Sequence, residues 1–254
     1  MTVTLAISLV CADFIPERKA ALDRLLAALG EPVDHVEGGK KSVREWSEGL
    51  WYGGLVAAEA RWASHCLFMT EDCIVPPDVL RHVRDALSAK PDEVVSFHPN
   101  SPAAIVARDS GLSWFTSVDG LVGTMYALPV GLLAKFLRWR ETDLLPAAKD
   151  YAEDSQIGLW CMVTDRLIWH SVPGLFYSDS TLTSLFGHDS DPMKQPVVGF
   201  RDVDLDAVDW ETGAVHAGRC YRGTFWRMVD HIRPEVVADS GLVKKAYRLA
   251  RVNG

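Results

Sequence analysis

The chain lacks any uninterrupted apolar run long enough to cross a membrane, and its N-terminus has no basic region followed by an apolar signal core. We therefore expect a soluble cytoplasmic protein that does not enter the membrane and is not exported. Internal repeats and low-complexity segments are missing as well. The 254 residues, 48% of them hydrophobic, are enough for one large core, so disorder is not expected.

Paired cysteine spacings are also absent. Five cysteines are scattered at positions 11, 66, 73, 161 and 220, which predicts free thiols rather than a disulfide framework or a zinc site. The chain has no surplus of basic residues either. Its net charge of −8 argues against a protein whose whole surface binds nucleic acid, but leaves room for a local basic patch.

Hydrophobic patterning predicts alternating strands and helices. Residues 3–10 suit a strand covered on both faces, Pro16 starts a helix that ends at Gly30, and Ser42 with Glu45 suggests a capping box before a second helix. We expect further strands at 33–36, 65–70, 93–97, 103–107, 113–118, 121–128 and, as the last core strand, 167–172, with helices starting at Pro76, at Pro129 and at about Glu153. The pattern predicts an α/β domain over residues 1–200 and a basic, aromatic extension over 201–254.

An acidic pair at the end of a predicted strand is the most informative feature. Glu71 and Asp72 follow the apolar run from His65, at the end of a strand where open α/β sheets bind ligands. Carboxylates are natural ligands of hard divalent cations, and such cations usually accompany substrate phosphates. Neighbouring strand residues point to opposite faces, so we expect Asp72 to contact a metal and Glu71 to orient the site. The alternatives are that Asp72 caps the next helix or that both acids are solvated.

Two later segments carry further candidates. Asp154 lies at a predicted helix N-terminus, where the helix dipole favours an ionised carboxylate, and is our candidate general base; an ordinary helix cap is the alternative. The segment 173–189 offers Asp179 and His188 as further metal ligands, unless it is a plain surface loop. Among the nine tryptophans, Trp46 beside the Gly38-Gly39 loop is the one expected to contact a ligand, while the others suit the core.

In order, these motifs resemble a GT-A-type glycosyltransferase of the phage and bacterial kind, with a Rossmann-type mixed sheet flanked by helices. The resemblance covers about residues 3–200 and rests on the strand, acidic pair and proline of 65–77, the Ala127-Leu128-Pro129 run, the Glu-Asp helix start and the segment 167–187. Two departures stand out. Cys73 follows the acidic pair, so the Asp-any-Asp spacing is missing, and Tyr177-Ser178-Asp179 stands where the family often has His.

The resemblance implies an inverting transfer from a nucleotide-sugar donor, with a UDP-sugar expected and Mn or Mg bridging its diphosphate. It also implies that Cys11, Ala12 and Glu37 contact the nucleotide, that Arg18 reaches phosphate, and that Glu71 and Trp46 belong to the donor site. The expected acceptor is a hydroxymethylated pyrimidine in phage DNA, bound by the basic C-terminal region, which would place the enzyme in the host cytoplasm. A cell-surface glycan, a protein or a small molecule is the alternative acceptor.

Two other functions remain open at this point. A nucleotidyltransferase would use a similar sheet and acidic pair, but it normally has a Gly-rich basic loop after the first strand, and Val10-Cys11-Ala12-Asp13 supplies none. A non-catalytic carbohydrate- or DNA-binding module would keep the aromatic and basic residues without needing Asp72 or Asp154.

Overall fold

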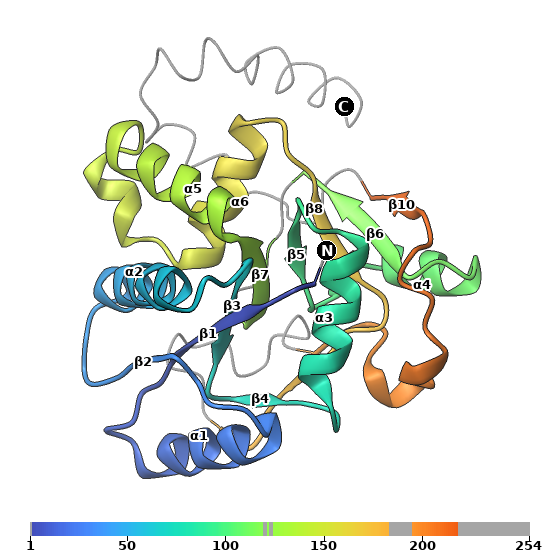
Figure 1. The fold of residues 1–254 in the computed structure, drawn as a ribbon, viewed down its shortest axis with the longest axis horizontal. Helices are drawn as coiled ribbons and strands as arrows, with labels where there is room; N and C mark the ends of the chain where they lie inside the picture. The colour runs from blue at the N-terminus through green and yellow to red at the C-terminus, as the bar shows by residue number, and fades with distance from the viewer. Residues whose placement is uncertain (1, 119–120, 122–123, 183–194, 218–254) are drawn as a thin grey trace.

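The computed structural model describes residues 2–118, 121, 124–182 and 195–217, which form a central sheet with helices on both faces (Figure 1). Within these ranges the sheet has eight strands, in the spatial order β10 (Ala214–His216), β6 (Trp114–Ser117), β8 (Ile168–Ser171), β5 (Val94–Ser96), β7 (Met125–Pro129), β3 (His65–Thr70), β1 (Leu5–Val10) and β2 (His35–Glu37). Two short strands, β4 (Cys73–Ile74) and β9 (Tyr177–Ser178), pair antiparallel as a separate ribbon.

The connecting helices are mostly those that the sequence pattern requires. The α-helices are α1 (Pro16–Leu29), α2 (Val43–Arg61), α3 (Val79–Ala89), α4 (Ala103–Asp109), α5 (Val130–Thr142) and α6 (Glu153–Val163). Short 3-10 turns are η1 (Pro146–Asp150), η3 (Phe200–Asp202) and η4 (Leu205–Ala207).

Strand directions bring many chain ends to one edge of the sheet. Strands β1, β2 and β3 are mutually parallel, β7 runs against β3, and β5 runs against β7 and is parallel to β8. The carboxyl ends of β1, β2, β3, β5 and β8 therefore meet at the same edge, together with the amino end of β7. Open α/β sheets bind ligands at this edge.

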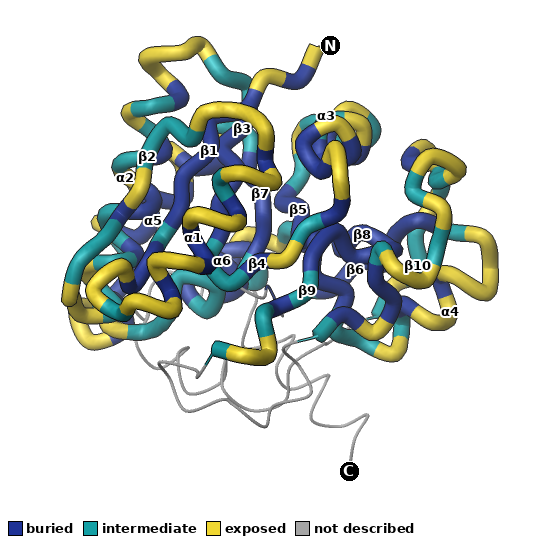
Figure 2. Tube along the Cα trace, turned by 90° about the horizontal axis from the view of Figure 1, so that it is seen from below, coloured by how far each residue is buried: buried dark blue, intermediate teal, exposed yellow. Residues whose placement is uncertain are grey.

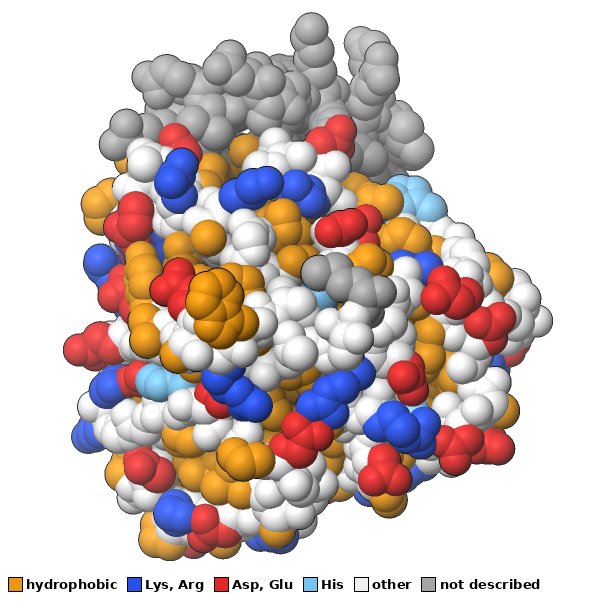
Figure 3. Space-filling model, viewed as in Figure 1, with side chains coloured by type: hydrophobic (Ala, Val, Ile, Leu, Met, Phe, Trp, Pro, Cys, Tyr) orange, Lys and Arg blue, Asp and Glu red, His pale blue; other side chains and the backbone are white. Residues whose placement is uncertain are grey.

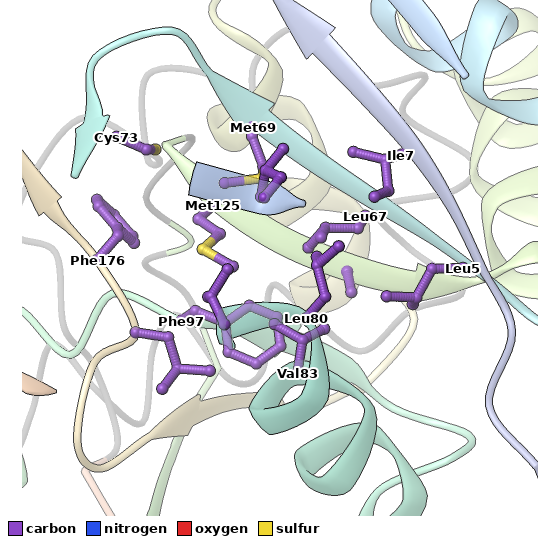
Figure 4. Close-up of a cluster of buried hydrophobic side chains, with 14 of the residues drawn as sticks. Leu5, Ile7, Leu67, Met69, Cys73, Leu80, Val83, Phe97, Met125 and Phe176 are labelled. Carbon is purple, nitrogen blue, oxygen red and sulfur yellow. The ribbon is translucent and has the colours of Figure 1, made fainter. Parts of the chain in front are cut away.

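Side chains of the central strands alternate between two hydrophobic layers. Ala6 and Phe68 face the layer filled by α2, α5 and α6, whereas Ile7 and Met69 face α1 and α3. The second layer is drawn in Figure 4. The inner strands β1, β3, β5, β6, β7 and β8 are buried along almost their whole length, whereas the edge strands β2 and β10 are largely uncovered, and most other exposed residues lie on the outer faces of the helices and loops (Figure 2). This two-sided burial explains why the strand at residues 5–10 is apolar or small throughout.

The predicted α/β fold with a mixed sheet flanked by helices is confirmed. Helix α1 starts at Pro16 and ends at Gly30, whose φ of 67° is the left-handed conformation that glycine adopts easily. The capping box of α2 forms between Ser42 and Glu45. Helix α6 starts at Glu153, as expected.

Three sequence expectations are wrong in detail. Residues 103–109 form helix α4 rather than a strand, because Ala104 and Ala107, three positions apart, pack against the buried ring of Phe115 on β6. The acidic pair is followed by strand β4, so the next helix begins at Val79 and not at Pro76. Residues 167–172 do supply a core strand, but β10 extends the sheet beyond it on the other side of β6.

Residues after 200 also contribute to this sheet and core: Trp210 is buried and its backbone carbonyl accepts a hydrogen bond from Trp114. The division at residue 200 stays a prediction, and most of the basic extension (218–254) lies outside the described residues. Where the structure describes them, the cysteines are buried free thiols, as expected. In the described part of the chain, no helix combines the length and the apolar composition of a membrane-spanning segment.

Candidate functional site

The loops that follow β1 and β2 are bonded to each other at the ligand-binding edge of the sheet. The Gly39 amide donates to Asp13 Oδ1 at 2.7 Å, and the Trp46 indole donates to the Gly39 carbonyl at 3.1 Å. The two loops approach closely at Gly38, where a Cβ would lie 2.8 Å from Asp13 Oδ2 and would push that side chain aside. Trp46, singled out from the sequence, is therefore half-buried with its ring nitrogen committed to this loop.

Glu37 ends β2 with its carboxylate almost covered. It accepts hydrogen bonds from Lys41 and lies 3.3 Å from His35 Nε2. Helix α2 makes room for it at Gly49, where a Cβ would come 2.1 Å from the Glu37 carboxylate. The Glu37 backbone carbonyl accepts a hydrogen bond from the Cys11 amide at 2.9 Å. The predicted nucleotide contacts Cys11 and Glu37 are thus neighbours in space.

Cys11 and Ala12, directly after β1, are both buried. Burial, reinforced by the Glu71 and Asp13 carboxylates, raises the pKa of the Cys11 thiol to about 12, so it stays protonated and unreactive at neutral pH. The Ala12 amide donates to Glu71 Oε1 at 3.4 Å.

Glu71 forms a buried ion pair that ties the end of β3 to helix α1. Arg18 Nη1 lies 2.5 Å from Glu71 Oε1, and the two side chains are only 9% and 4% exposed. Burial raises the pKa of the Glu71 carboxyl above its ordinary value, and the Arg18 guanidinium opposes that rise. Both residues were predicted to bind the donor; the structure brings them together and bonds them to each other.

Asp72 leaves the sheet toward the β4–β9 ribbon. Its Oδ1 accepts a hydrogen bond from Thr70 Oγ1 at 2.5 Å, and its backbone carbonyl accepts the Asp179 amide at 2.8 Å. Because Cys73 pairs with Ser178, the ribbon sets Asp72 opposite Asp179, two acids more than a hundred positions apart in the sequence. The backbones of two of the three predicted metal ligands are thus bonded to each other. His188, the third, lies outside the described residues.

Asp179 already has partners on both carboxylate oxygens. Oδ2 lies 2.8 Å from Arg24 Nη2 of α1, and Oδ1 accepts the amide of Thr181 at 2.9 Å. Burial acts to raise the pKa of Asp179, but the hydrogen bonds from Thr181 and Arg24 outweigh it and lower the pKa. Asp72 and Asp179 could offer oxygen ligands to a hard cation, but they do not make a complete site by themselves. Among the described residues, no group of three or more His, Cys, Asp or Glu side chains is arranged to hold a metal.

Asp154 lies at the start of α6, on the opposite face of the sheet from Arg18. Its neighbour Glu153 lies within reach of the Ser47 hydroxyl of α2, and both acids act electrostatically on the buried Tyr126 hydroxyl near the amino end of β7. Burial and the adjacent Asp154 charge raise the pKa of Glu153 to about 8. The start of α6 therefore reaches the same edge of the sheet as the ends of β1, β2 and β3.

Sequence reasoning missed Asp13, Arg24 and Glu153. Asp13 directly follows β1, so its position could have suggested it. Arg24 carries no signal in the sequence, because an exposed arginine on an amphipathic helix looks like any solvated charge. Glu153 was passed over for its neighbour, although burial and the adjacent Asp154 charge raise the pKa of its carboxyl to about 8.

No protein-family model matches this chain, and no curated protein sequence matches it. One similar solved structure is that of a mannose-1-phosphate geranyltransferase from Thermus thermophilus. It shares 11% sequence identity over 69% of this chain and 75% of that chain, with a TM-score of 0.35. A likeness of this size carries no argument about function.

Proposed function

We propose that the chain is a nucleotide-sugar-dependent glycosyltransferase that moves a sugar from a donor, expected to be a UDP-sugar, to an acceptor hydroxyl with inversion. The observations that support this most are that Asp72 follows the carboxyl end of β3 and that Asp154 begins α6, whose first residue lies within reach of Ser47 near the start of α2. One acid comes from the end of β3 beside the β4–β9 ribbon, the other from the start of α6. A cation held beside the leaving diphosphate and a base beside the acceptor hydroxyl are what a single displacement needs.

The donor nucleotide would lie over the loops that follow β1 and β2. Asp13, Glu37 and Trp46 line these loops. Asp13 and Trp46 each hydrogen-bond to the Gly39 backbone, and the Glu37 carbonyl accepts the Cys11 amide, so the loops are held in place before the donor arrives. Arg18 and Glu71 would contribute by fixing the β1 loop against the end of β3. Such preorganisation reduces the ordering cost of binding.

Asp72 and Asp179 would hold Mn or Mg, with His188 as a further candidate ligand. When bound, the cation would neutralise the charge that develops on the departing diphosphate. A cation on Asp179 must displace Arg24 from Oδ2. Arg24→Gln should therefore tighten Mn²⁺ binding severalfold, measured by calorimetry without any donor, while Asp72→Asn should weaken it. Equal Mn²⁺ affinity in all three proteins would exclude these carboxylates as ligands.

Asp154 would accept the proton of the acceptor hydroxyl. As that oxygen attacks the anomeric carbon, the bond between this carbon and the diphosphate oxygen breaks, and the proton passes to an Asp154 carboxylate oxygen. Removing a general base typically lowers the rate by about 10²- to 10⁴-fold. Asp154→Asn should therefore lose turnover while retaining donor binding, and Asp143→Asn, on a turn residue after α5, serves as the control.

The experiment is a screen of nucleotide-sugar donors by thermal shift with and without Mn²⁺, followed by transfer assays. A donor present at about 100 times its Kd stabilises the native protein by about 2.7 kcal/mol and raises Tm. A binding module would keep its affinity in Asp154→Asn and show no turnover in the wild type. If no nucleotide-sugar shifts Tm, or Asp154→Asn transfers as fast as the wild type, the proposal is wrong.

For the acceptor we propose a hydroxymethylated pyrimidine in phage DNA. This proposal rests on the resemblance and on basic residues between positions 219 and 251, which lie outside the described residues. Acidic and basic side chains are interspersed over the face shown in Figure 3. Transfer to hydroxymethyl-containing duplex DNA tests the proposal. Its absence with every donor that binds would leave lipopolysaccharide, protein or small-molecule acceptors.

A further inference from the structure

A fully buried arginine on α5 bonds to side chains of α2 and α6, close to the start of α6. Arg140 of α5 is 0% exposed. Its guanidinium donates to Gln156 of α6 through Nε, to Glu48 of α2 through Nη2 and to Glu141 through Nη1, each at 2.8 Å. It also lies over the Trp51 ring, 5.5 Å from the centroid. Because the guanidinium fork is planar and its N–H groups point in fixed directions, these bonds fix the positions of three neighbouring side chains relative to one another.

Gln156 connects Arg140 to the segment that leads into α6. Its side chain is buried, and its Nε2 donates to the backbone carbonyl of Tyr151 at 2.6 Å and to that of Lys149 at 3.3 Å. The Gln156 amide group is therefore used in both directions, as acceptor from Arg140 and as donor to the incoming chain. Asp154 lies within the loop that these bonds close.

Stability alone does not account for this arrangement. The surrounding layer is already apolar, with Trp51, Phe136 and Trp160 in contact across α2, α5 and α6. A well-packed apolar side chain in place of a buried ion is often neutral or stabilising, because burying a charge costs solvation energy. Hydrogen bonds are directional, whereas dispersion contacts are not. An apolar side chain at this position would therefore not fix the angle at which α6 meets α2.

We propose that Arg140 and Gln156 are positioning residues for Asp154, which set the place of its carboxylate relative to the ligand-binding edge of the sheet. This inference rests on the proposed function. Neither residue touches the donor loops after β1 and β2 in this structure, so their effect should fall on the chemical step and not on donor binding.

The test compares Arg140→Met, Arg140→Lys and Gln156→Leu with the wild type. A displacement of about 1 Å can cost about 100-fold in rate, so we expect kcat to fall about 100-fold in Arg140→Met and Gln156→Leu, with the donor KM within twofold of the wild type. Arg140→Lys keeps the charge but loses the fork, so it should recover only part of kcat. Gly54→Ala, which presses α2 against Phe68 of β3 and alters none of the groups hydrogen-bonded to Arg140 or Gln156, is the destabilised control and should keep kcat at temperatures well below its Tm.

A second measurement keeps the inference testable apart from activity. Amide hydrogen exchange of residues 150–158 should speed up at least tenfold in Arg140→Met, whereas the amides of β1 and β3 should exchange as in the wild type. Unchanged exchange at the start of α6 overturns the inference, even if the wild type proves to have no transferase activity and the proposed function fails. Unchanged kcat in an active Arg140→Met variant overturns it too, as does an equal loss of kcat in Gly54→Ala.

Discussion

The buried ion pair of Arg18 and Glu71 allows a quantitative prediction, because only one of its two groups can lose its charge when the partner is removed. Arginine stays protonated in proteins, whereas a carboxylate can take up a proton. Glu71→Gln leaves a guanidinium that is 9% exposed without its counter-charge. We expect this variant to lose about 3–5 kcal/mol in free energy of unfolding, the usual cost of breaking a buried ion pair.

Arg18→Met should behave differently with pH. The abandoned Glu71 carboxyl can be protonated, and from its ordinary pKa of 4.5 this costs at most about 3.4 kcal/mol at pH 7 and about 0.7 kcal/mol at pH 5. The folded-state pKa is raised in this variant, so the native state binds more protons than the unfolded state and stability falls as pH rises. Arg18→Met should therefore be destabilised by about 3 kcal/mol at pH 7 and by less than about 1 kcal/mol at pH 5, apart from lost packing.

The double variant Arg18→Met/Glu71→Gln removes both charges and should lie within about 2 kcal/mol of the wild type. Urea unfolding followed by tryptophan fluorescence at pH 5 and 7 measures all four proteins, and a loss of 3 kcal/mol should also lower Tm by roughly 6–12 °C. Lys19→Met, which breaks an exposed pair with Asp23 on the same helix, is the control and should change little. Equal loss in Arg18→Met at both pH values, or a double variant as unstable as the sum of the single ones, would refute the reasoning.

Two further predictions concern the glycines at 54 and 131 and the carboxyl of Glu153, whose pKa is raised. Gly54→Ala should destabilise the protein by about 1–3 kcal/mol in urea unfolding, because the new Cβ would lie 2.8 Å from the buried Phe68 ring. Gly131→Ala on α5, where a Cβ meets nothing within 4 Å, should instead stabilise it by up to about 1 kcal/mol, and effects of the same sign would contradict the packing argument. Since the folded state raises the pKa of Glu153 to about 8, its ionisation costs stability as pH rises from about 4.5 to 8. Glu153→Gln should gain stability relative to the wild type across this window, and a pH-independent difference between their urea midpoints would show that the carboxyl is not desolvated.

Local signals in the sequence predicted the elements that depend on near neighbours. The Pro16 start and Gly30 end of α1 and the capping box of Ser42 follow from backbone and capping chemistry within a few residues, and the two acids in the first turn of α6 suit the helix dipole. Residues 103–109 show the limit of this reasoning. Their short apolar stretch before Gly111 suggested a strand, but helix α4 forms because two alanines one turn apart fit against β6.

The candidate site also has features that the sequence determined and features that only the tertiary structure decided. The sequence determined that acids follow β3 and begin α6, because the end of an apolar run and a helix start are visible in the order of residues. Only the tertiary structure decided which charges meet: Glu71 with Arg18, Asp179 with Arg24 and with the backbone of Asp72, and Gln156 with Arg140. The physical reason is that ion pairing and desolvation depend on distance and burial in three dimensions, and spacing along the chain carries little of either.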